Sequence, residues 1–123
     1  MVAREKDGPA RVLVIDDDEA ICGLISKYLQ HLGHSVEYQP DGRELDTALS
    51  APLDVVLLDV NLQDTDGFAL LERVVRERPD ISVIMLTAST EVENVVEAMR
   101  RGAFDYLSKP IDFQRLNLSL IHI

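Results

Sequence analysis

An apolar run ends in four consecutive acids in the stretch VLVIDDDE, from Val12 to Glu19. A run without charge that is rich in Val, Ile and Leu is typical of a parallel strand covered on both faces. Two similar runs follow, at residues 55–58 and 83–86, and weaker strand-like runs lie at 36–38 and 104–107. The sequence therefore predicts five strands, three of them buried on both faces.

Helical periodicity fills the intervals between these runs. Apolar residues recur at helical spacing within residues 21–32, 68–75 and 92–99, and a shorter helix is expected from Asp41 to Leu49. Regular alternation of strand and helix with short connections predicts an α/β fold, a doubly wound five-stranded parallel sheet with helices on both faces. In the flavodoxin-like strand order 2-1-3-4-5, ligands bind at the carboxyl ends of the central strands.

The composition indicates one acidic domain. The 123 residues include 12 Lys and Arg against 22 Asp and Glu, for a net charge of −10, and such a surface repels the phosphates of nucleic acids. No apolar run approaches the ~20 residues of a membrane span, and the first nine residues are not those of a secretory signal. We therefore expect no direct nucleic-acid binding, no membrane segment and a cytoplasmic location, with a flexible tail at residues 1–10 and the domain at 11–123.

Polar side chains stand where four of the predicted strands end. Asp16 and Asp17 follow the first strand, Asp59 ends the third, Thr87 ends the fourth, and Lys109 follows the fifth. Each has an ordinary explanation by itself, as a turn residue, a helix cap or a solvated lysine. Because the carboxyl ends of parallel strands meet at one edge of a sheet, the sequence predicts that these side chains converge in one crevice.

Three carboxylates, a hydroxyl and an ammonium group suit phosphoryl transfer onto a carboxylate. Acidic oxygen ligands are those that Mg²⁺ prefers, and a cation relieves the repulsion between neighbouring carboxylates. The negative charge of a transferred phosphoryl group is met by metal, lysine and hydroxyl donors. We therefore expect a Mg²⁺-dependent phosphoryl-transfer site at the strand ends.

The chain resembles a known family, the CheY-like receiver domain of two-component response regulators, over roughly residues 11–115. The matching motifs are Val-Leu-Val-Ile-Asp16-Asp17-Asp18, Val-Val-Leu-Leu-Asp59-Val-Asn61, Asp66-Gly67, Leu-Thr87-Ala and Asp-Tyr106-Leu-Ser-Lys109-Pro110. As a set, these motifs are highly specific for the family.

The resemblance implies a role for each site residue. Asp59 would be the phosphoacceptor nucleophile, and Lys109 would contact the phosphoryl oxygens. Asp17 would bind Mg²⁺ directly, Asp16 would act mostly through water, and Asn61 would offer its backbone carbonyl to the metal. The implied metal site is thus formed by Asp16, Asp17, Asp59 and Asn61.

The resemblance also implies a switch and a set of partners. Thr87 and Tyr106 would form the switch that responds to phosphorylation, and the Lys109–Pro110 peptide bond would be cis. The partners would be a histidine kinase or phosphotransfer protein, an output domain or downstream protein, and a second copy in a phosphorylation-dependent homodimer. Such a domain catalyses only its own phosphorylation and dephosphorylation and turns over no metabolite.

Two parts of the chain depart from the family pattern. Gln63 stands where the family usually has proline, which removes no catalytic group. The stretch from Leu118 to Ile123 carries no Asp, Glu, Lys or Arg and leaves the last helix little polar face. Either a partner covers this helix or its end is truncated or non-native, and we favour the second interpretation.

Two other functions are compatible with parts of this pattern. A pseudo-receiver would bind partners without phosphorylation, although members of that class usually lack one or more site groups. A haloacid-dehalogenase-like phosphatase would use Asp16 as its nucleophile, because Asp16-x-Asp18 after a strand imitates the motif of that family. The phosphatase alternative fails on chain length and on Ala20 and Ile21, where a Thr or Val is expected.

Overall fold

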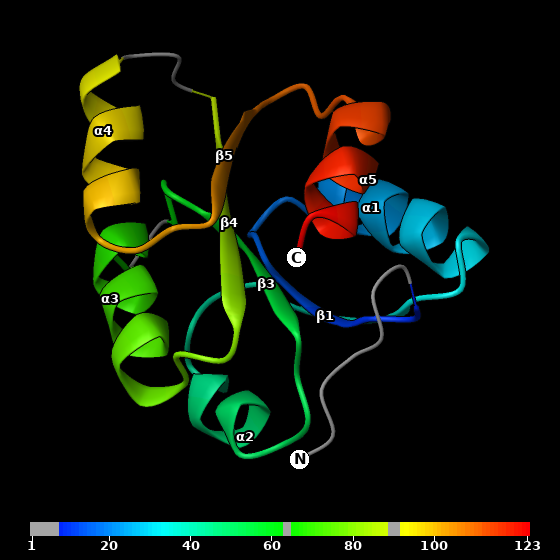
Figure 1. Ribbon diagram of the computed structural model, residues 1–123, viewed down its shortest axis with the longest axis horizontal. Coiled ribbons are helices and arrows are strands. Elements are labelled where there is room, and N and C mark those ends of the chain that lie inside the picture. Colours follow the sequence, from blue (N-terminus) through cyan, green and yellow to red (C-terminus); the bar gives the residue numbers. More distant parts are fainter. Residues whose placement is uncertain (1–7, 63–64, 89–91) are drawn as a thin grey trace.

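The computed structural model describes residues 8–62, 65–88 and 92–123 (Figure 1). Strands and helices alternate along these residues: β1 (Arg11–Ile15), α1 (Glu19–His31), β2 (Ser35–Gln39), α2 (Leu45–Leu49), β3 (Val55–Asp59), α3 (Gly67–Glu77), β4 (Ser82–Thr87), α4 (Val92–Arg100), β5 (Asp105–Ser108) and α5 (Phe113–Ile121). This is the predicted α/β alternation.

The strands form one parallel sheet in the order β2-β1-β3-β4-β5, which confirms the predicted flavodoxin-like topology. The three charge-free runs become the three central strands, and their apolar residues are buried. The edge strands β2 and β5 are more exposed, in keeping with their weaker apolar patterns.

Helices cover both faces of the sheet, with α1 and α5 on one side and α3 and α4 on the other (Figure 1). Successive strand residues point to opposite faces, so each strand contributes to two separate cores. Val12 and Val14 belong to the cluster that includes residues of α1 and α5, whereas Leu13 and Ile15 pack with residues of α2, α3 and α4. This burial on both faces holds the central strands in place. Their carboxyl ends are not covered by these two cores.

Local sequence signals set the helix ends. Asp18, Asp66 and Asp112 cap α1, α3 and α5 by accepting backbone N–H groups, an arrangement worth about 1 kcal/mol per helix. Gly33 and Gly102 adopt φ values of 95° and 101° directly beyond α1 and α4. None of the helices in the described ranges has the length and apolarity that crossing a bilayer requires.

The starts of the second helix and of the packed domain differ from those expected from sequence. The second helix begins at Leu45 instead of Asp41, because the Asp41 carboxylate accepts the Arg43 N–H and holds the chain in a turn. Ala10, expected in the tail, is only 1% exposed and lies in the core that includes α1 and α5. Its N–H donates to His34 Nδ1 at 2.9 Å, so the packed domain begins one residue earlier than expected.

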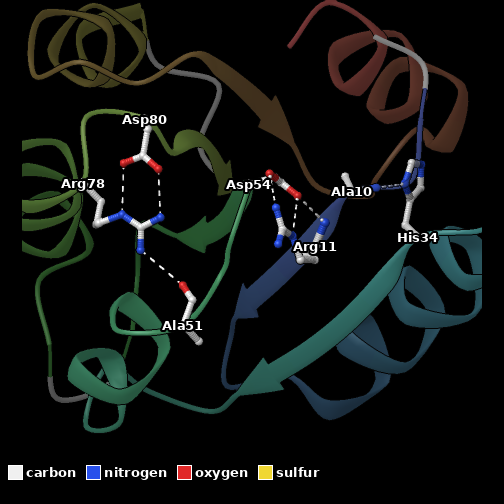
Figure 2. A network of polar contacts seen from close by, with 7 residues as sticks. All are labelled: Ala10, Arg11, His34, Ala51, Asp54, Arg78 and Asp80. Atoms are coloured by element: carbon white, nitrogen blue, oxygen red, sulfur yellow. Dashed lines mark hydrogen bonds and ion pairs between the residues drawn. The ribbon is translucent and has the colours of Figure 1, made fainter. Parts of the chain in front are cut away.

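Figure 2 shows two arginine–aspartate pairs, of which Arg11–Asp54 lies beside Ala10 and His34. Arg11 of β1 makes two side-chain hydrogen bonds to Asp54, the residue before β3, at 3.0 and 3.1 Å. Arg78 pairs with Asp80 and also donates to the backbone oxygen of Ala51 at 3.2 Å. These arginine–aspartate pairs hold together the segments that precede the central strands. They lie at the amino ends of these strands, opposite the predicted site.

Candidate functional site

The carboxyl ends of the central strands bring the predicted side chains to one edge of the sheet. Asp16 directly follows β1, Asp59 is the last residue of β3, and Thr87 is the last residue of β4. Asp59 pairs in register with Leu86, and Thr87 with Ser108, the residue before Lys109. The topology therefore places all four residues beside one another.

Lys109 lies between two buried carboxylates. Its Nζ is 2.8 Å from Asp16 Oδ2 and 3.4 Å from Asp59 Oδ2. The Asp16 side chain is fully buried and that of Asp59 is 6% exposed. The Lys109–Pro110 peptide bond is cis, as predicted, and the Lys109 N–H donates to the Thr87 carbonyl at 2.7 Å.

Backbone N–H groups orient the remaining carboxylate oxygens. Asp59 Oδ1 accepts the Asn61 N–H at 3.0 Å, and Asp16 Oδ1 accepts the Asp18 N–H at 2.9 Å. Each buried carboxylate is thus held on one oxygen by the chain, while its other oxygen faces Lys109.

Asp17 completes an acidic cluster with these two residues. One carboxylate oxygen from each of Asp16, Asp17 and Asp59 lies within 4.8 Å of the others, and Asp17 is exposed. Three acidic oxygens around one point are a donor set that suits a hard divalent cation such as Mg²⁺. The cluster fits the predicted metal site, whereas the part assigned to the Asn61 carbonyl stays a prediction.

The pKa shifts of Asp59 and Lys109 have different balances of causes. Burial raises the pKa of the Asp59 carboxyl, and the negative charge of Asp16 raises it further, although the Asn61 N–H and Lys109 act against both. Burial lowers the pKa of Lys109, but its hydrogen bond to Asp16 and the charges of Asp16 and Asp59 outweigh this, so that its pKa is raised. Lys109 therefore remains a cation, and a cation bound at the cluster would stabilise the ionised form of Asp59.

The proposed switch residues lie on neighbouring strands. Thr87 is fully buried at the end of β4, and Tyr106 of β5 is half-buried, in register with Met85 and packed against the core formed with α2, α3 and α4. Their role as a switch stays a prediction. Gln63 and Ser89, which would border the site, lie outside the described residues.

Gly67 is a site residue whose part could not be read from sequence periodicity. A Cβ at this position would lie 2.5 Å from the Asp59 carbonyl oxygen and 2.7 Å from that of Val60. The first turn of α3 therefore rests directly on the backbone of Asp59. The Asp66-Gly67 pair was visible in the sequence, but the close approach depends on tertiary structure.

Comparison with known proteins identifies the family. The family model of the response regulator receiver domain matches residues 12–121. The chain belongs to this family. Receiver domains of response regulators are signalling proteins, and the acidic cluster and the lysine lie at the ends of β1, β3 and β5, within the motifs shared with this family.

Individual relatives agree with this membership. The transcriptional regulatory protein ZraR of Escherichia coli K12 is 38% identical over 110 residues, which cover 89% of this chain and 25% of ZraR. The structure of the Vibrio cholerae chemotaxis protein CheY4 has a TM-score of 0.85 at 34% identity, with 94% of this chain and 99% of that chain covered. The receiver domain thus spans about a quarter of the length of the first of these relatives and nearly all of the second.

A third relative was solved with ligands. The response regulator of Burkholderia pseudomallei has a TM-score of 0.82 at 26% identity, over 90% of this chain and 66% of that one. Its structure holds a phosphorylated aspartic acid, a calcium ion and citrate.

Proposed function

We propose that this receiver domain accepts a phosphoryl group on Asp59 from a histidine kinase or phosphotransfer protein, in a Mg²⁺-dependent reaction. The observation that carries the proposal is the position of Lys109 between Asp16 and Asp59, with the Asp17 carboxylate completing the cluster. The phosphorylated aspartic acid and the divalent ion in the Burkholderia pseudomallei relative support the same chemistry here.

Each site residue has a separate role in the proposed reaction. The Asp59 carboxylate attacks phosphorus, so that a new oxygen–phosphorus bond forms while the bond from phosphorus to the donor nitrogen breaks and the donor histidine leaves. Lys109 and the Thr87 hydroxyl meet the negative charge on the phosphoryl oxygens. Hydrolysis later returns inorganic phosphate and the free carboxylate.

Mg²⁺ fits the acidic cluster by the chemistry of its donors. Asp17 and Asp59 would hold the ion directly, Asp16 would hold it mostly through water, and Asn61 would contribute its backbone carbonyl. When bound, the ion would neutralise carboxylate charge and the charge that develops on the phosphoryl group. Without a cation, the buried negative charges of Asp16 and Asp59 repel an incoming anion.

In this proposal, phosphorylation changes a surface of the domain to which an output domain or downstream protein binds. ZraR is named as a transcriptional regulatory protein, and this chain matches a quarter of its length. We infer an output of this regulatory kind, a cytoplasmic location, and a homodimer through the face formed by α4, β5 and α5. With its net charge of −10, the chain itself is not expected to bind nucleic acid.

The two alternative functions receive less support. Pseudo-receivers usually lack one or more site groups, whereas the acids, the threonine and the lysine are all present and adjacent here. A phosphatase that uses Asp16 as its nucleophile needs an accessible Asp16 carboxylate, whereas this side chain is fully buried and bound to Lys109.

Intact mass spectrometry tests the proposal. Acetyl phosphate with Mg²⁺ should add one phosphoryl group to the wild-type chain and none when Mg²⁺ is chelated. Asp59→Asn should abolish the addition, while Asp66→Asn, which removes an exposed carboxylate that caps α3, should preserve it. Undiminished labelling of Asp59→Asn would refute the assignment of the acceptor.

A further inference from the structure

Arg101, the residue after α4, contacts side chains from two helices. Its Nε lies 2.5 Å from Glu97 Oε1 of α4, and its Nη1 lies 3.2 Å from Glu72 Oε1 of α3. Its guanidinium carbon also lies 5.2 Å from the ring centre of Phe68, at the start of α3. Arg101 therefore bridges α3 and α4 through a charge pair and a cation–π contact.

Helix α4 buries few of its side chains. Ala98 is the one buried residue among those of α4, all of which are described. The apolar side chains of Val92, Val96 and Met99 are 74%, 48% and 46% exposed. Because buried apolar area is the main source of packing energy, α4 contributes little apolar packing of its own, and the Arg101 contacts to Glu72 and Phe68 add to it.

The α3 end of this bridge lies next to the acceptor. Gly67 packs against the carbonyl oxygens of Asp59 and Val60 so closely that no Cβ would fit. Phe68, which carries the ring beneath Arg101, is the next residue. Contacts thus connect the Asp59 backbone through Gly67 and Phe68 to Arg101.

We propose that Arg101 is a positioning residue that couples the acceptor side of the site to α4, and this inference rests on the proposed function. The contacts run from Asp59 through the first turn of α3 to α4, and they are separate from the Thr87 and Tyr106 route. The Arg101 contacts are present in the same structure in which Lys109 lies between Asp16 and Asp59. In this proposal the Arg101 contacts stabilise the arrangement described here, and a shift of α4 on phosphorylation would have to break them.

Amide hydrogen exchange in α4 tests the first half of this inference. Arg101→Ala should speed exchange of the α4 amides by about fivefold, because the variant removes both the cation–π contact to Phe68 and the ion pair to Glu72. Glu72→Gln, which leaves the contacts to Phe68 and Glu97 in place, should give a smaller change in the same direction. Arg100→Ala removes an exposed arginine one position earlier and should leave exchange unchanged. Equal exchange in Arg101→Ala and wild type would overturn the inference.

Binding of beryllofluoride, a mimic of a phosphoryl group on a carboxylate, tests the coupling. By thermodynamic linkage, removal of a contact that opposes the change should tighten beryllofluoride binding in the presence of Mg²⁺, by about threefold in Arg101→Ala. An unchanged affinity together with faster α4 exchange would mean that the bridge is only structural and would overturn the coupling. Failure of the wild-type chain to bind beryllofluoride would overturn the proposed function itself, while the exchange experiment would still decide whether Arg101 holds α4.

Discussion

At the scale of single residues, the site is defined by an imbalance of charge. Asp16, Asp17 and Asp59 bring three carboxylates to one point, and Lys109 supplies one ammonium group between two of them. Two of the acids are buried, where an unneutralised charge is costly. A divalent cation would neutralise part of this negative charge, so we expect metal binding and phosphorylation of Asp59 to depend on each other.

Adjacent acids should separate metal binding from helix capping. Asp17→Ala should weaken Mg²⁺ binding strongly, because the variant removes an exposed carboxylate from the cluster. Asp18→Ala should leave Mg²⁺ affinity nearly unchanged and lower the free energy of unfolding by about 1 kcal/mol, because Asp18 caps α1. Calorimetric Mg²⁺ titration and urea unfolding of both variants measure the two effects. Equal Mg²⁺ affinities in the two variants would refute both roles.

Asp105 predicts a pH dependence of stability outside the site. Burial raises the pKa of its carboxyl, but the Tyr106 N–H, the Ser119 hydroxyl and Arg115 outweigh burial and hold the pKa below its ordinary value. A carboxyl with a lowered folded-state pKa stabilises the fold above its unfolded-state pKa, and this contribution is lost as the pH falls through the folded-state pKa. Asp105→Asn should therefore cost about 1 kcal/mol at neutral pH, a figure reduced for the exposure of Arg115.

The cost should narrow as the pH falls below about 4, the ordinary pKa at which the carboxyl protonates in the unfolded chain, and it should disappear below the lower folded-state pKa. Urea unfolding at neutral and acidic pH measures the difference, with Glu93→Gln on the exposed side of α4 as the control. A cost that stays constant across this pH range would show that the Asp105 charge is not responsible.

At the scale of elements, the close contact between α3 and β3 positions Asp59, the proposed acceptor. Gly67→Ala should lower the free energy of unfolding by about 1–3 kcal/mol and slow labelling of Asp59, because a Cβ would displace the acceptor backbone. Gly23→Ala is the matched control, since its Cβ meets nothing within 4 Å in the interior of α1, and it should be neutral or stabilising. Unfolding and acetyl phosphate labelling of both variants decide the point. If Gly67→Ala behaves like Gly23→Ala, the contact does not position Asp59.

Elements with a strong local signal were predictable from sequence. The central strands are charge-free runs, and parallel topology then determines which side chains share the site edge, so Asp16, Asp59 and Lys109 could be placed together. The start of α2 was missed because the Asp41 side chain forms a turn that competes with the helix. Gly67 and Arg101 act through contacts between elements, which local periodicity does not encode.

At the scale of the whole molecule, the site must act on a distant surface. A new phosphoryl oxygen beside β4 can accept a hydrogen bond from Thr87, and inward movement of this side chain would leave space for the Tyr106 ring. A charge-assisted hydrogen bond of ~1.5–3 kcal/mol can shift a two-state equilibrium by about tenfold or more. The surface expected to change is formed by α4, β5 and α5, where Val92, Val96 and Met99 are exposed.

Thr87→Ala should preserve phosphorylation of Asp59 and weaken the response of this surface. Sedimentation with and without phosphodonor measures self-association, which should increase in the wild-type chain and increase less in the variant. An undiminished response in Thr87→Ala would mean that the signal leaves the site by another route, of which the Arg101 bridge is the candidate.

The most direct test of the central claim is to locate the phosphoryl group. Borohydride reduces an acyl phosphate and converts the modified aspartate to homoserine, which peptide mass spectrometry can assign to one residue. After treatment with acetyl phosphate and Mg²⁺, we predict homoserine at Asp59. Homoserine at Asp16, the nucleophile of the phosphatase alternative, would contradict the claim that Asp59 is the phosphoacceptor.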